Sequence, residues 1–459
     1  MDELFTRINM LLIELSIVLT IIVILVCVIK YIPKLFYKLK NANLKLTKQA
    51  DANGIILGRI GSYVLFSPIY CEGHAIVLGS SGSAKTTAVL LPTLASLSKN
   101  TGFFTIDISG DISENLASNA NDSNLQTIIF DPTNTDNRVI YNPFDLIDKL
   151  HNEAQINEAL TQLAFQIIPD KATEDNSKWF DDGGRSILIA SLICFYHADF
   201  DFQEICKIIN DNPYQELFDK IDKTENTQAI RYLNQFIGMS EKNISGCMQS
   251  AIAHIQLFNS PILDDKLRRP RHIDEQILTP DSIENSRIFF IIPDSKKEQY
   301  APLIEIVVSQ LIEYINNRPP ALIKNKVVIA IDEFASFKNL DLSQPLAKSR
   351  KKGCRIIILC QNLNQIARNF GEYAMKEIVD NCSINVICNI AEPGSQKYFS
   401  EKAGMKIKRN EINQQQIPIF RPETFGKLRR TNIILCNGEH FRVFKNYFWK
   451  FYKNSENSD

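Results

Sequence analysis

A short segment, GSSGSAKTT at residues 79–87, limits the possible folds of this chain more than any other feature. It follows an apolar run typical of a buried strand, His74–Leu78, and it precedes an apolar helical pattern. Its frame is G-x-x-x-x-A-K-T, whereas the phosphate-binding loop (P-loop) consensus is G-x-x-x-x-G-K-[S/T]. Small residues are needed because backbone N–H groups and a helix N-terminus must surround the phosphate oxygens. The expected nucleotide-binding residues are Gly79, Ser80, Ser81, Gly82, Ser83, Ala84, Lys85, Thr86 and Thr87.

Two residues of this loop have specific expected roles. Lys85 should reach the β- and γ-phosphates, and the Thr86 hydroxyl should bind Mg²⁺, so ATP and Mg²⁺ are the expected ligands. Ala84 stands where glycine is usual, and its Cβ disfavours positive φ. Because a helical φ would permit alanine there, we expect weakened rather than abolished nucleotide binding.

A second segment, KVVIAIDEF at residues 326–334, is an apolar strand pattern that ends in two acids. At the carboxyl end of a parallel strand, Asp332 and Glu333 would lie beside the P-loop. We expect Asp332 to complete the metal site with Thr86, and Glu333 to polarise the attacking water. The alternative is an ordinary Asp–Glu pair at a strand end.

Further catalytic candidates follow in the run KSRKKGCRIIILCQ, residues 348–361. Gln361 ends a strand pattern and would sense the γ-phosphate or orient water beside the acids. Arg350 could act as an arginine finger on the nucleotide of a neighbouring subunit. Its alternative is a solvated cation in a basic loop. Arg355 is a rival for the finger, but it lies inside the strand pattern and should point into the fold.

The fold class follows from short apolar runs rich in Ile, Val and Phe, which are typical of buried parallel strands. Helical patterns between several of them predict an α/β doubly wound domain. The expected strands are His74–Leu78, Gly102–Asp107, Gln126–Asp131, Arg287–Pro293, Lys326–Asp332, Cys354–Cys360, Ile384–Asn389 and Asn432–Cys436.

A long gap between these strands reads as helices only. The expected helices are Gln155–Ile168, Gly184–Tyr196, Phe202–Asn210, Thr227–Met239 and Ile244–Phe258. The segment 145–265 holds 20 Asp and Glu against 9 Lys and Arg. We therefore expect an acidic all-helical domain at 145–265, inserted into a P-loop domain formed by 46–144 and 266–453.

The N-terminal segment 1–45 has the pattern of a membrane anchor. The uncharged run Leu15–Ile29 is extended by flanking residues to a span of about 10–32. Six lysines follow the uncharged run and only Arg7 precedes it, so the bulk of the chain should be cytoplasmic. We expect a single-pass protein of the bacterial inner membrane, and a disordered tail at 454–459.

The amino-acid composition excludes several classes of protein. The chain has 459 residues, of which 45% are apolar and 22% charged, so it is not a wholly disordered, collagen-like or polytopic membrane protein. A net charge of −1 means that any contact with nucleic acid must be local. The ten cysteines form no C-x-x-C pair and lie among apolar residues, which indicates buried thiols in a reducing compartment.

Several segments together resemble the type IV secretion coupling proteins, the membrane-anchored ATPases of conjugative DNA transfer. The resemblance covers roughly residues 54–450. It is carried, in order, by LGSSGSAKTTAVLLPTL, FFTIDISGDI in place of the family's D-x-K-G-E, IIFDP, YNPFD, KWF, AIDEF and LCQNLNQI. It departs from the family at Ala84, where glycine is usual, and at Ser109, where lysine is common.

This resemblance implies a RecA-like motor domain with an inserted all-α domain, assembled as a homo-hexamer. It also implies a substrate, which is single-stranded DNA bound without sequence preference, a secreted protein, or both. The implied partners are components of the secretion channel. Cations at 266–271 and 348–355 are candidate DNA contacts, with solvated loops as the alternative reading. Two other functions remain open: a hydrolysis-impaired membrane adaptor that recruits substrates, and a septal-type DNA translocase.

Overall fold

The computed structural model describes residues 10, 15–20, 31–97, 100–117, 124–170, 176–409 and 414–451. Its centre is a twelve-stranded sheet with the order β1-β3-β2-β16-β15-β12-β4-β11-β10-β5-β9-β6. The strands are β1 Lys45–Thr47, β2 Gly54–Ile60, β3 Tyr63–Pro68, β4 Ala75–Gly79, β5 Phe103–Asp107, β6 Gln126–Phe130, β9 Ser286–Ile291, β10 Val327–Ile331, β11 Cys354–Cys360, β12 Ile384–Asn389, β15 Thr431–Cys436 and β16 Glu439–Phe444.

Seven neighbouring strands, from β12 to β6, are parallel. They are the apolar runs expected from the sequence, and the core residues of β4, β10 and β11 are buried throughout. The α/β class is confirmed. One expectation was wrong, because β15 pairs antiparallel with both β12 and β16. A short Asn437–Gly438 turn joins β15 to β16, and a turn that short permits only a hairpin.

Helices cover both faces of the sheet. On one face, α2 (Leu91–Ser96) and α3 (Asp111–Leu116) pack on the alternate residues of β4 and β5 that include Val77 and Phe103. On the other face, α11 (Lys297–Asn316), α12 (Ser343–Ser349) and α13 (Leu363–Asn381) pack on the opposite set, which includes Leu78 and Phe104. The period of two along each strand therefore supplies two separate cores.

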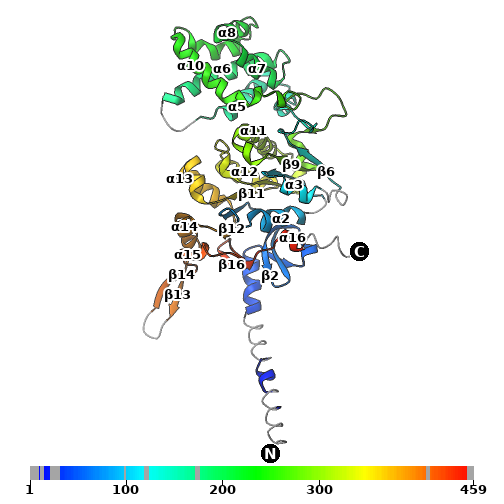
Figure 1. The fold of residues 1–459 in the computed structure, drawn as a ribbon, viewed down its shortest axis with the longest axis vertical. Helices are drawn as coiled ribbons and strands as arrows, with labels where there is room; N and C mark the ends of the chain where they lie inside the picture. Colours follow the sequence, from blue (N-terminus) through cyan, green and yellow to red (C-terminus); the bar gives the residue numbers. More distant parts are fainter. Residues whose placement is uncertain are drawn as a thin grey trace, which may run out of the picture.

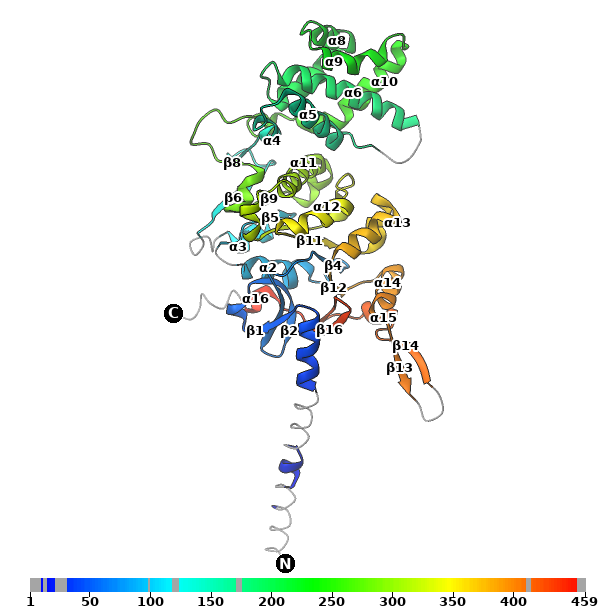
Figure 2. The same cartoon turned by 180° about the vertical axis from the view of Figure 1, so that it is seen from behind.

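Between the short paired strands β7 (Ile140–Tyr141) and β8 (Ile277–Leu278), every regular element that the described residues form is a helix. The α-helices are α4 Asp145–Asp148, α5 Glu153–Ile167, α6 Asn176–Tyr196, α7 Phe202–Asp211, α8 Tyr214–Asp222, α9 Thr227–Leu233 and α10 Glu241–Ile255. α6 lies at the centre and packs against α5, α9 and α10. Figures 1 and 2 show this helical region at one end of the molecule, beyond α11.

Two differences from the expected helices concern this region. α8 was not expected from the sequence, and the single helix expected over Thr227–Met239 is α9 followed by a 3₁₀ turn, Asn234–Phe236. The domain boundaries at 145 and 265 remain a prediction.

The opposite end of the molecule carries the N-terminal helical segment, whose described part includes 31–41. The span expected at 10–32 lies largely outside the described residues, as does the tail 454–459. Within the described part of the chain, no helix has both the length and the apolar character needed to cross a membrane. A hairpin of β13 (Met405–Arg409) and β14 (Gln414–Pro418) projects toward the same end.

The remaining helices are α14 (Pro393–Ala403), which follows β12, α15 (Pro422–Phe425), which precedes β15, and α16 (Phe448–Phe451), which follows β16. Nine cysteines fall in the described residues, all as free thiols, and all but Cys71 are buried. That agrees with the expectation of small buried hydrophobic side chains.

Candidate nucleotide-binding site

The expected site residues follow three adjacent strands. β11 lies between β4 and β10, and all three are parallel, so their carboxyl ends share one edge of the sheet. The P-loop follows β4, Asp332 and Glu333 follow β10, and Gln361 follows β11. The Thr86 hydroxyl donates a hydrogen bond of 2.9 Å to Oδ2 of Asp332. The structure thus brings the two expected metal ligands together across 246 residues of sequence.

The P-loop has a left-handed backbone at two positions. Gly82 has φ +72°, which glycine adopts freely, but Ala84 has φ +66°. The expectation of a helical φ at Ala84 was therefore wrong. Lys85 then takes helical angles, and residues Thr86–Leu90 form a π-helical turn that continues into α2. A left-handed alanine costs roughly 1–2 kcal/mol, so surrounding contacts must hold this loop in place.

Glycine at position 79 is required by close packing. A Cβ there would lie 2.4 Å from the Ser83 hydroxyl oxygen, so the loop closes tightly on the end of β4. The Lys85 ammonium reaches back along the loop and donates a 2.7 Å hydrogen bond to the Gly79 carbonyl. Its charge therefore lies beside the P-loop backbone, where the helical turn Thr86–Leu90 begins.

The two acids after β10 have different surroundings. Asp332 is 9% exposed, and burial raises the pKa of its carboxyl, although the Thr86 hydroxyl and the Glu333 backbone N–H oppose that shift. Glu333 has φ +48° and is partly exposed. Its carboxylate accepts a 2.6 Å hydrogen bond from Lys297 at the start of α11, and Lys297 also contacts Asp294 at 2.8 Å.

Three contacts of the P-loop come from outside the motif. Ser80 donates its backbone N–H to the carbonyl of Asn389 at the end of β12, and its hydroxyl accepts from Ala391. The buried Lys445, which follows β16, donates to the carbonyl of Ser83 at 2.7 Å. Sequence reasoning missed Lys297, Asn389 and Lys445, and no short motif identifies them, because each acts across a long sequence separation.

Arg350 lies elsewhere. It begins the 3₁₀ turn Arg350–Lys352 after α12, its side chain is half exposed, and its Nε is 3.9 Å from a carboxylate oxygen of Glu72. Glu72 precedes β4, so Arg350 lies at the amino ends of the strands, opposite the P-loop within the same chain. The rival Arg355 is buried and donates to the backbone carbonyls of Gly73 and Pro68, as expected of a residue that points into the fold.

The first aspartate of FFTIDISGDI, Asp107, stabilises the local fold. Asp107 is buried at the end of β5 and accepts hydrogen bonds from the backbone N–H groups of Gly110, Ile112 and Ser113. It therefore fixes the turn that begins α3, and burial raises the pKa of its carboxyl.

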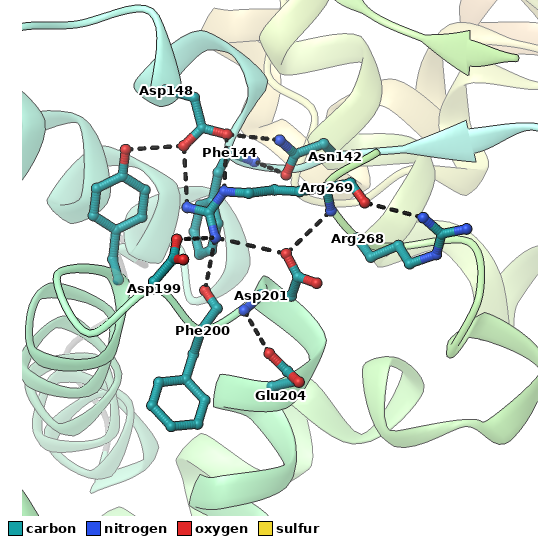
Figure 3. Close-up of polar contacts among 10 residues, drawn as sticks. Asn142, Phe144, Asp148, Asp199, Phe200, Asp201, Glu204, Arg268 and Arg269 are labelled. Carbon is teal, nitrogen blue, oxygen red and sulfur yellow. Dashed lines mark hydrogen bonds and ion pairs between the residues drawn. The ribbon is translucent and has the colours of Figure 1, made fainter. Parts of the chain in front are cut away.

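The cations at 266–271 are largely committed to the fold. Arg269 donates to both carboxylate oxygens of Asp148 and to the carbonyl of Phe200, and its guanidinium lies over the rings of Phe144 and Tyr196 (Figure 3). Arg268 pairs with Glu275, and buried Lys266 donates to two backbone carbonyls. Arg269 thus holds its segment against α4 and the turn before α7, Arg268 pairs within the same segment, and Lys266 holds the loop that follows β6. These contacts leave little of the three side chains for DNA.

Comparison with known proteins identifies the family of this chain. A family model described as "Type IV secretory system Conjugative DNA transfer" matches residues 34–419. The chain belongs to this family. Curated relatives include the conjugal transfer protein TraG of Rhizobium radiobacter, 22% identical over 74% of this chain and 53% of that protein. VirD4 of Bartonella henselae, a type IV secretion system-coupling protein, is 20% identical over 80% of this chain and 59% of that protein. The chain spans about half the length of the curated relatives it matches.

Solved structures of the plasmid coupling protein TrwB share the fold. The complex of TrwB with ADP and Mg²⁺ has a TM-score of 0.66 at 17% identity, over 82% of this chain and 85% of that one. The complex with a non-hydrolysable GTP analogue has a TM-score of 0.65 at the same identity, over 81% and 86%. This chain therefore shares its α/β fold with TrwB.

Proposed function

We propose that this chain is a P-loop ATPase with a RecA-like motor domain that couples substrates to a type IV secretion channel. The observation that carries the proposal is the 2.9 Å contact between Thr86 and Asp332 at the end of β4 and β10. A hydroxyl beside a carboxylate supplies the hard oxygen ligands that Mg²⁺ prefers, and ATP phosphates supply others. When bound there, Mg²⁺ neutralises charge on the phosphate oxygens.

The chain's own residues account for the remaining steps. Lys85 exchanges the Gly79 carbonyl for phosphate oxygens, and the loop N–H groups bind the same anions. Glu333 polarises the attacking water through its carboxylate, of which Lys297 contacts only Oε2. Gln361, between the two motifs, orients that water against the γ-phosphate.

Arg350 acts on a different copy of the chain. Its place at the opposite ends of the strands excludes its own P-loop, so any nucleotide that it contacts belongs to another subunit. We therefore propose a homo-hexamer in which Arg350 is an arginine finger in trans. Mixing inactive Arg350→Ala with inactive Lys85→Ala should restore part of the turnover, because some interfaces then hold both intact parts.

Lys351→Ala is the matched control, because it removes an exposed cation from the same turn. It should retain full turnover. Co-assembly of the two inactive proteins without any recovery would refute a finger supplied by a neighbour.

The substrate is proposed to be single-stranded DNA, a secreted protein, or both, and the place of action is the inner membrane, with a single N-terminal span at about 10–32. ATPase rates of the full-length protein with and without single-stranded DNA test the substrate. Several-fold stimulation supports a motor on DNA, whereas rates indifferent to DNA support protein cargo. Absence of turnover under either condition, in a folded preparation, would overturn the ATPase itself.

A further inference from the structure

The buried amine of Lys445 is in an unusual position for a lysine. Its side chain is 5% exposed, and burial lowers the pKa of its ammonium. Its Nζ donates to the carbonyl of Ser83, 2.7 Å away and 362 residues earlier in the chain. Burying a lysine costs free energy. A buried lysine that donates to one loop carbonyl therefore indicates a specific role.

The geometry of a planar peptide shows what this contact does. In a trans peptide the carbonyl oxygen and the next N–H point in opposite directions. Because Lys445 comes from outside the P-loop and binds the Ser83 carbonyl, the N–H of Ala84 points away from Lys445. That N–H is one of the groups a P-loop offers to phosphate.

Ala84 makes this peptide vulnerable. Its φ of +66° is costly for alanine, and rotation of the Ser83–Ala84 peptide would return φ to the favoured negative range. The same rotation would turn the Ser83 carbonyl inward, where its partial negative charge repels phosphate. Glycine at this position would have no preference between the two peptide orientations.

We propose that Lys445 is a positioning residue that holds the Ser83–Ala84 peptide in the phosphate-binding orientation, in place of the glycine that this loop lacks. The proposal rests on nucleotide binding at this P-loop. It predicts an energetic coupling between Lys445 and Ala84 that no merely structural lysine would show.

The test measures affinity for Mg-ADP in four full-length proteins: wild type, Lys445→Met, Ala84→Gly and the double variant. We expect Lys445→Met to weaken ADP binding about tenfold, because a buried carbonyl loses a charged donor and the peptide rotates. Ala84→Gly alone should change affinity by less than about threefold. The double variant should recover most of the loss.

Lys266→Met is the matched control. Lys266 is also buried, its pKa is also lowered by burial, and it also donates to backbone carbonyls, those of Asp131 and Asn137, but away from the P-loop. It should lower thermal stability comparably and leave ADP affinity unchanged.

Equal ADP affinities for Lys445→Met and Lys266→Met would overturn the proposal, as would a double variant no better than Lys445→Met. If Lys445→Met does not fold, Lys445→Leu, which also removes the donor, replaces it, and failure of Ala84→Gly to improve ADP affinity of that variant overturns the proposal equally. A folded wild type that binds no ADP would instead refute the proposed function.

Discussion

Arg269 offers a direct measure of how the segment 266–271 is held against the helical region. Its fork donates to Asp148 at 3.1 and 3.2 Å and to the Phe200 carbonyl at 3.1 Å, and Asp199 and Asp201 lie 3.7 and 3.6 Å away (Figure 3). Replacing it with alanine leaves three carboxylates close together without their shared cation. Burial and the neighbouring Asp148 already raise the pKa of Tyr196 to about 12, so this site disfavours added negative charge.

The magnitude follows from burial. Breaking a buried ion pair by removing one partner costs about 3–5 kcal/mol. The Arg269 and Asp148 side chains are 23% and 30% exposed, so solvent screens part of that cost. We therefore expect Arg269→Ala to lower the free energy of unfolding by about 2–3 kcal/mol. Arg269→Lys keeps the charge but loses the two-pronged geometry, and should cost about 1–2 kcal/mol.

The two tryptophans permit a local assay. Trp179 lies in α6 of the helical region and Trp449 in α16 near the C-terminus, so urea titrations of variants with one tryptophan each follow the two regions separately. Arg269→Ala should shift the Trp179 transition to lower urea. The control is Arg271→Ala, an exposed cation of the same basic run, which should shift it by less than about 0.5 kcal/mol.

The refuting result is specific. If Arg269→Ala were as stable as Arg271→Ala but had reduced affinity for single-stranded DNA, the run 266–271 would contact DNA rather than hold to the helical region. Reduced stability with unchanged DNA affinity supports the structural role.

Three further outcomes are expected. Lys85→Ala should abolish ATP turnover and retain the far-UV circular dichroism spectrum, and wild-type turnover would refute the P-loop assignment. Ala84→Gly should raise the free energy of unfolding by about 0.5–1 kcal/mol, and the melting temperature with it, because relief of the left-handed alanine exceeds the entropic cost of glycine; a lower melting temperature would contradict this. His74, whose pKa burial lowers to about 4, accepts from the Ile356 N–H as a neutral ring. Its contribution to stability, about 3 kcal/mol at most, is complete above pH 6.5 and is lost as pH falls toward 4. His74→Gln should flatten urea midpoints measured across that range.

The sequence predicted those parts of the fold that depend on local pattern. Each expected strand from β4 to β15 is present within one or two residues, because buried parallel strands require continuous apolar runs. The pairing of Thr86 with Asp332 was also predictable, since both follow parallel strands and must meet at one edge. Local pattern failed at the sheet's antiparallel end, where the hairpin turn after β15 sets strand direction.

Backbone conformation and distant partners were not predictable. No pattern in GSSGSAKTT reveals that Ala84 takes a positive φ, because the dihedral is imposed by how the loop closes against the rest of the fold. Lys445 and Lys297 reach the site from 362 and 36 residues away from their partners, and each stands in an unremarkable local sequence. Such contacts arise only when the whole sheet is assembled.

The separation of Arg350 from the P-loop bears on regulation as well as on chemistry. Within one chain, the Thr86–Asp332 pair, Lys85 and Glu333 occupy one end of the strands, while Arg350 occupies the other, near Glu72. A lone subunit can therefore bind nucleotide with its own residues but cannot supply the cation that we propose for the γ-phosphate. Turnover per subunit should then rise steeply with protein concentration, whereas nucleotide affinity should change little. That difference separates assembly-dependent catalysis from assembly-dependent folding, because a subunit that folds only in the ring would lose binding and turnover together on dilution.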